Sequence, residues 1–161
     1  KKYGKLPSNI ILIPPENNIS TYSIFEKCSS VIIYGTKMGI ELSAMKKLVI
    51  VCGEAFIRNK KLGIDVENID QYKEILNKIE NLNYTTDNLS EIRSIKYAYH
   101  FFFRRTVEFS SIIERKGKWP NFEVDENYTK KLLNKSDLGL EMVCDSIISG
   151  KDFIFEDEKH Y

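Results

Sequence analysis

A chain of 161 residues with 42% hydrophobic side chains has the length and apolar content of one globular domain. Its 24 basic and 23 acidic residues almost cancel, so no strong field would gather a polyanion, and nucleic acid is not an expected partner. The chain has only two histidines, His100 and His160, which argues against a histidine metal site and against a Ser/His/Asp triad, so no metal is expected.

The first half of the chain alternates short apolar runs with stretches of helical length, a rhythm typical of βαβ units and a parallel sheet. Three runs of mostly branched apolar residues, at 10–13, 31–34 and 48–51, are expected as buried strands. Amphipathic stretches at 20–28 and 37–45 predict helices between them. Right-handed crossovers would then lay the three strands parallel, with all carboxyl ends on one edge.

The middle of the chain predicts longer helices. A loop at 54–68 precedes a helix over about 70–81, and a second, long helix is expected over 89–114. The aromatic cluster at 97–103 is too apolar on all sides for a simple surface helix, so something must cover it. Burial in an interdomain layer or in the C-terminal helix layer is the favoured interpretation, and contact with a membrane surface is the alternative.

The last part predicts a loop over 117–127, an amphipathic helix over 138–149 and a loose acidic tail over 153–161. The predicted fold class is α/β. A Rossmann-like parallel-sheet core is expected over 1–86, followed by C-terminal helices over 87–161 that pack on the same domain.

The turn after the second apolar run is the strongest candidate for a binding site. A helix that begins at Thr36, directly after a strand and Gly35, would offer free N–H groups and the positive end of its dipole to an anion. Gly35 would let the backbone approach a phosphate, and Thr36 could cap the helix or donate its hydroxyl to the phosphate. Lys37 opposes the helix dipole, which a bound anion would offset, although a solvated lysine is the simpler interpretation.

Four further positions belong to the same candidate site. Gly39 stands where a capping box has Glu or Gln and costs about 1 kcal/mol relative to alanine, so it serves either a ligand or close helix–sheet packing. Glu41, on the second turn, could accept hydrogen bonds from a ribose or sugar diol, whereas a solvated glutamate is the ordinary alternative. Pro14 and Gly53 follow the first and third runs, so their loops would meet the Gly35 turn on one edge.

These residues also carry a resemblance to a known family. The segments 20–22, 28–41 and 47–53 resemble the C-terminal, donor-binding domain of GT-B glycosyltransferases, particularly capsule polysaccharide biosynthesis proteins. Such families share a strand, a pair of small or hydroxyl residues, a helix that carries a glutamate, and a second strand. The segments 97–105 and 137–150 are similar to the capsule group as well.

The resemblance implies a substrate and a partner domain. A nucleotide-sugar donor would be held by Gly35, Thr36 and neighbouring N–H groups at its phosphate, and by Glu41 at its ribose or sugar. The acceptor would be a polysaccharide or a lipid-linked glycan, and a further N-terminal Rossmann domain would supply the acceptor site and the catalytic base. No cofactor is expected, because the helix dipole and side chains stabilise the leaving phosphate. The catalytic residue stays unassigned.

The sequence also favours a location and leaves two alternatives open. Three widely spaced cysteines, Cys28, Cys52 and Cys144, predict free thiols in a reducing cytoplasm, and no apolar segment is long enough for a bilayer span. Because surface polysaccharide is made at the inner membrane, peripheral association there is compatible with the family. The alternatives are a non-catalytic Rossmann-like module that binds a partner protein, and a nucleotide-sugar epimerase-like domain.

Overall fold

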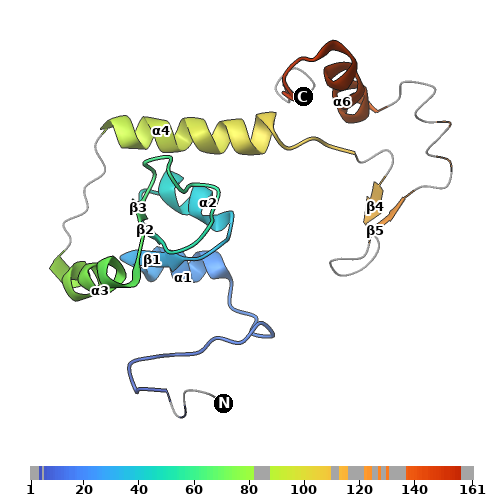
Figure 1. The fold of residues 1–161 in the computed structure, drawn as a ribbon. Helices are drawn as coiled ribbons and strands as arrows, with labels where there is room; N and C mark the ends of the chain where they lie inside the picture. Colours follow the sequence, from blue (N-terminus) through green and yellow to red (C-terminus); the bar gives the residue numbers. More distant parts are fainter. Residues whose placement is uncertain are drawn as a thin grey trace.

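The structure is a computed structural model, and it describes residues 4, 6–81, 88–109, 113–115, 122–124, 127, 130 and 137–156. The chain folds as an α/β protein with a small parallel sheet and helices packed on it (Figure 1). The elements in chain order are α1 (Thr21–Lys27), β1 (Ser30–Ile33), α2 (Met38–Ala44), β2 (Leu48–Val51), β3 (Ile64–Asp65), α3 (Ile69–Lys78) with a 3-10 turn (Ile79–Asn81), α4 (Asn88–Tyr99) with a π-helical turn (His100–Arg104), β4 (Ile113–Arg115), β5 (Phe122–Val124) and α6 (Leu138–Ser149).

The sheet has the strand order β1-β2-β3, and both strand pairs are parallel. Ser30 lies opposite Leu48, and Ile50 lies opposite Ile64. Every residue of the central strand β2 is buried, as expected for a parallel strand covered on both faces. The prediction of parallel strands at 31–34 and 48–51 is therefore confirmed.

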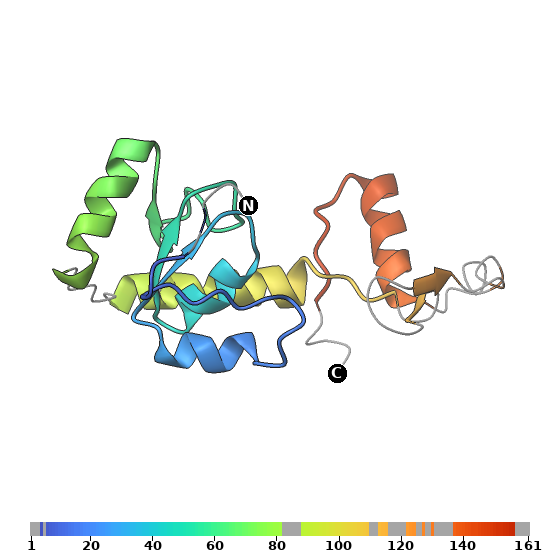
Figure 2. The same cartoon turned by 90° about the horizontal axis from the view of Figure 1, so that it is seen from below.

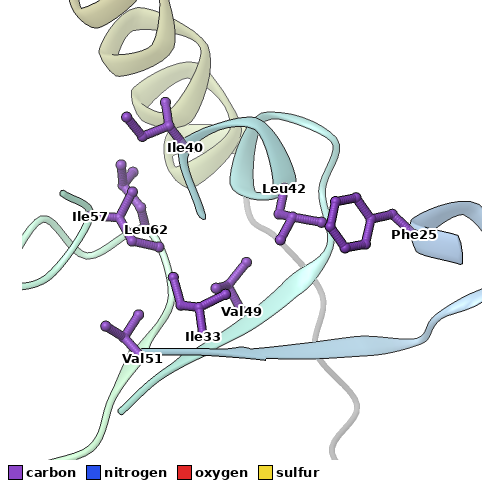
Figure 3. Packing of buried hydrophobic residues seen from close by; sticks show 8 residues of the cluster. All are labelled: Phe25, Ile33, Ile40, Leu42, Val49, Val51, Ile57 and Leu62. Carbon is purple, nitrogen blue, oxygen red and sulfur yellow. The ribbon is translucent and has the colours of Figure 1, made fainter. Parts of the chain in front are cut away.

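Alternate residues of β2 build two separate cores. Val49 and Val51 pack with Ile40 and Leu42 of α2 on one face of the sheet (Figure 3). Aromatic side chains of α4 and of the π-helical turn after it also pack on this first core. Leu48 and Ile50 point to the opposite face, where α3 covers them. Because side chains alternate along a strand, one short apolar run supplies both cores.

The first apolar run does not form a strand. Ile10 to Ile13 have no regular structure, and their side chains are between 41 and 84% exposed. Two turns enclose the run, closed by hydrogen bonds from the Ile10 N–H to the Pro7 carbonyl and from the Asn17 N–H to the Pro14 carbonyl. The predicted strand at 10–13 is wrong, because an apolar run becomes a strand only where a neighbouring strand accepts its backbone. Pro14 therefore lies in an irregular segment and not at the end of a strand.

A short strand lies within the segment that we predicted to be a loop. β3 pairs with β2 through only two residues, Ile64 and Asp65. The preceding Gly63 is required sterically, since a Cβ there would lie 2.6 Å from the Val49 carbonyl oxygen. The prediction of an uninterrupted loop at 54–68 is therefore wrong at this point.

The long helix ends earlier than the sequence predicts. α4 continues into a single π-helical turn, which the hydrogen bond from the Arg105 N–H to the His100 carbonyl closes. The Thr106 hydroxyl then donates a hydrogen bond to the Phe101 carbonyl, and residues 106–109 have no regular secondary structure. The predicted helix over 89–114 is wrong at residues 106–109, which follow these hydrogen bonds, while residues 110–112 lie outside the described part.

The C-terminal part combines one confirmed helix with two corrections. α6 spans the predicted residues 138–149, begins where the Asp137 carboxylate accepts the Leu140 N–H, and ends at Gly150, which has φ +66°. β4 and β5 form an antiparallel pair, so residues 113–115 are not helical and residues 122–124 are not loop.

The tail is not loose where the structure describes it. Phe155 is buried, and its N–H bonds the Arg104 carbonyl at 3.0 Å. This contact corrects the prediction of a loose tail at 153–156, whereas residues 157–161 lie outside the described part. The aromatic cluster also divides: Phe101 and Phe102 pack on the first core, while Tyr99 and Phe103 are exposed.

Candidate functional site at the carboxyl edge of the sheet

The turn after β1 leads directly into α2. The Thr36 Oγ1 atom accepts the Met38 N–H at 3.2 Å, which is the capping role among the two roles predicted for this hydroxyl. Lys37 occupies the N-cap position of α2 and is exposed. α2 has only seven residues, so its dipole is short, and the turn must act through its own N–H groups and neighbouring side chains.

The turns that follow β1 and β2 lie against one another, as the parallel sheet predicts. A Cβ on Gly35 would lie 3.4 Å from the Glu54 carbonyl oxygen, an ordinary contact. A Cβ on Gly53 would lie only 2.7 Å from the carbonyl oxygen and ring of Tyr34, so this position requires glycine. Two of the three predicted loops therefore meet at the carboxyl edge.

Gly39 has a packing role. It is buried, and a Cβ there would lie 2.6 Å from the Ile33 Cδ1 atom and 3.0 Å from the Ile57 Cδ1 atom. The glycine lets α2 approach β1 closely, which is the second of the two interpretations offered by the sequence. Gly39 therefore contributes to the site indirectly, because it lets α2 pack against β1 directly after the Gly35 turn.

Glu41 is engaged with α1. Its Oε2 atom accepts a hydrogen bond of 2.6 Å from the Tyr22 hydroxyl, and this bond to a carboxylate, together with the negative charge, raises the pKa of Tyr22. A ribose or sugar diol would have to share the Glu41 carboxylate with Tyr22 or replace that hydroxyl. Sequence reasoning missed this partner, because Tyr22 and Glu41 lie 19 residues apart on different helices.

A cavity of about 470 Å³ opens beside these turns on the face of the sheet that α3 covers. It is lined by Ile32, Ile33, Tyr34, Cys52, Val66, Glu67, Asn68, Ile69 and Tyr72. These residues come from the carboxyl ends of all three strands and from the start of α3. A mainly apolar cavity with a few polar groups, at this volume, is typical of a small-molecule site. The sequence did not reveal it, because its wall depends on the unexpected strand β3.

Arg58 fixes the carboxyl ends of β2 and β3. Its guanidinium donates to the Val66 carbonyl at 3.1 Å and the Gly53 carbonyl at 3.4 Å, and it pairs with the Glu67 carboxylate at 3.2 Å. The side chain is only 13% exposed, so Arg58 is a partly buried structural contact and not a surface charge. Burial raises the pKa of the nearby Cys52 thiol, and the Arg58 charge partly opposes that rise.

Wider comparisons give no family for the chain. No protein-family model, no curated protein and no solved structure matches it. Among the residues that the structure describes, no group of three or more His, Cys, Asp or Glu side chains is placed to hold a metal ion, and no helix is long and apolar enough to cross a bilayer. Any function must therefore be inferred from the residues of the edge itself.

Proposed function

We propose that this chain is the donor-binding part of a glycosyltransferase that uses a nucleotide-activated sugar. One observation carries the proposal: the 470 Å³ cavity lies at the carboxyl edge of a parallel sheet, beside the adjoining turns of Gly35 and Gly53. Open α/β sheets bind nucleotides at this edge, where loops from neighbouring strands converge. The segments that resemble GT-B donor domains include the same two turns.

The side chains and backbone groups at this edge suit both the base and the phosphate of such a donor. The cavity has an apolar wall with the rings of Tyr34 and Tyr72, which fits a planar base. The Gly35 turn allows close approach of a phosphate to backbone N–H groups, and Lys37 beside it adds a positive charge. In a transfer reaction these groups would stabilise the negative charge that develops on the leaving phosphate. The acceptor, a polysaccharide or a lipid-linked glycan, and the catalytic base would belong to a further domain.

Binding, rather than turnover, is the test that this chain permits. Titration calorimetry with UDP, GDP and CMP should show binding of at least one nucleotide. Tyr72→Ala, which removes a cavity wall, should weaken it about tenfold or more. Tyr99→Ala is the matched control, because Tyr99 lies on the exposed side of α4. A folded wild-type chain that binds none of the three nucleotides would contradict the proposal and favour the non-catalytic, partner-binding module.

Gly35→Ala separates the phosphate role from the stability role. A methyl group there meets only the Glu54 carbonyl at 3.4 Å, so the fold should tolerate it, while a phosphate could no longer approach the turn closely. We expect weaker binding of the nucleoside diphosphates and little change for the corresponding nucleosides. Equal weakening of both ligand classes would place the phosphate elsewhere.

A further inference from the structure

α4 carries two apolar faces. One face packs on α2 and the first core and includes Ser94, Tyr97 and Ala98. The other face, which continues into the π-helical turn, is exposed and forms what we call the outer stripe: Leu89, Ile92, Ile95, Tyr99 and Phe103, each between 41 and 61% exposed. Residues three or four positions apart lie above one another on a helix, so these five side chains form one continuous line. Figures 1 and 2 show α4 running along the outside of the sheet unit.

Positive charge accompanies this stripe. Residues 88–105 contain four cationic side chains and one carboxylate, that of Glu91. Residues 88–105 therefore carry a formal net charge of +3 with histidine neutral, whereas the whole chain carries +1. The Glu91 carboxylate forms an ion pair with the Lys46 ammonium at 2.7 Å. Lys96 is exposed and falls between Ile92 and Phe103 along the stripe by helical spacing. The Arg104 guanidinium lies 5.8 Å from the centre of the Tyr99 ring and 3.7 Å from the Glu156 carboxylate.

The position of Lys96 argues against a second copy of the chain as the occupant. The stripe runs from 89 to 103, and residue 96 is its midpoint. A two-fold pairing that aligns the two stripes, whether parallel or antiparallel, therefore brings Lys96 against Lys96. The same pairing brings two segments with excess positive charge together, which is unfavourable. The complementary surface must be apolar and negatively charged.

We propose that the outer stripe docks this protein onto the surface of a lipid bilayer that contains anionic lipids. Leucine and isoleucine side chains would enter the boundary between headgroups and acyl chains, and Lys96 would extend its stem along them and place its ammonium among the lipid phosphates. Tyr99 and Phe103, whose rings stack at 5.4 Å, are the kind of residues that occupy this boundary. α4 has 12 residues, so it lies in the plane of the surface and does not span it.

Vesicle co-sedimentation of the whole chain tests this docking. We expect binding to vesicles of phosphatidylcholine with phosphatidylserine, and binding about tenfold weaker or less to phosphatidylcholine alone. The double variant Ile92→Ser with Ile95→Ser should lose about tenfold or more on the anionic vesicles. Lys96→Glu should lose a similar factor there and little on neutral vesicles. Ile148→Ser on α6 is the matched control, since this isoleucine is 84% exposed but lies off the stripe.

Two further measurements keep the result decisive. Thermal unfolding of each variant should match the wild type, because the substituted side chains are exposed and outside both cores. Sedimentation equilibrium without lipid should show a monomer. The docking proposal is wrong if the double serine variant binds anionic vesicles as tightly as wild type. It is also wrong if the wild type forms a dimer that Ile92→Ser dissociates. It is wrong as well if the chain binds polyglutamate as tightly as it binds the vesicles and the double serine variant binds polyglutamate equally tightly.

Discussion

At the scale of single residues, the glycines in and around the sheet differ in which atoms would contact an added Cβ. Gly53 and Gly63 admit backbone atoms at distances that no Cβ tolerates, Gly39 admits the ends of two core side chains, and Gly35 alone has ordinary space around it. Only Gly35 could therefore accept a ligand without competing with the fold. This difference makes substitution of each glycine a distinct experiment.

Gly39→Ala should destabilise the fold although alanine favours helix. The new methyl group would overlap Ile33 and Ile57 in the core, which costs about 1–3 kcal/mol, while the gain in helix propensity is about 1 kcal/mol. We expect a net loss of up to about 2 kcal/mol in the free energy of unfolding by urea denaturation. Gly35→Ala, whose new methyl group makes only an ordinary contact with the Glu54 carbonyl oxygen, should change it by less than about 0.5 kcal/mol. Equal effects of the two substitutions would show that the core relaxes freely around α2.

The Tyr22–Glu41 pair predicts a pH effect with a definite sign. The hydrogen bond to the carboxylate and its charge raise the pKa of Tyr22 in the folded chain. The stabilisation is therefore complete below the ordinary tyrosine pKa and is lost as pH rises through the raised value. Glu41→Gln removes the negative charge, so the pKa of Tyr22 should fall, which carbon NMR of the Tyr22 Cζ would detect. An unchanged pKa would mean that the pair does not form in solution.

At the scale of elements, α3 depends on its N-cap residue, Asn68. The Asn68 side chain accepts hydrogen bonds from the Asp70 and Gln71 N–H groups, and it also lines the cavity. Asn68→Ala should cost about 1 kcal/mol of stability, because both N–H groups lose their partner. Asn77→Ala on the same helix is the matched control and should be neutral within about 0.5 kcal/mol. Chemical denaturation of the two variants gives the comparison, and an equal loss would contradict the capping role.

Elements whose signals are local were predicted well. β2 is a run of four apolar residues, which is the pattern of a buried strand. α6 is preceded by an N-cap aspartate, Asp137, and followed by a glycine, Gly150, and both signals are visible in the sequence. The run at 10–13 has the same composition as a strand, but pairing depends on a neighbour that composition does not reveal. β3 is the opposite case, since two residues carry no periodicity, and its strand exists because Gly63 lets it approach β2.

The candidate site, too, combines features with a local signal in the sequence and features that depend on contacts between distant segments. The adjoining turns of Gly35 and Gly53 were predictable, because parallel strands place their carboxyl ends together. The Thr36 cap was one of two predicted roles. The cavity, the Arg58 contacts and the Tyr22 bond all join segments that are distant in the chain, and no local pattern predicts such contacts.

At the scale of the whole molecule, two groups of contacts hold the chain. α1, α2, α3 and α4 pack on the sheet through its two cores, while α6 lies beyond the end of α4 in both views (Figures 1 and 2). A Cβ on Gly139 of α6 would contact Val107, and the tail bonds Arg104 and Arg105. The segment 104–108 thus links α6 to α4. The division after residue 86 stays a prediction, although α4 shares its core with α2.

Phe155→Ala should therefore loosen α6 without loosening the sheet. Phe155 is 5% exposed, and truncation of such a buried ring costs about 3–5 kcal/mol locally. Hydrogen exchange should accelerate at α6 amides, whereas protection of Val49 and Val51 in β2 should stay the same. Phe153→Ala is the matched control, because its ring is exposed and its carbonyl can still accept from Arg105. Parallel loss of protection in β2 would instead show that α6 and the sheet unfold as one cooperative unit.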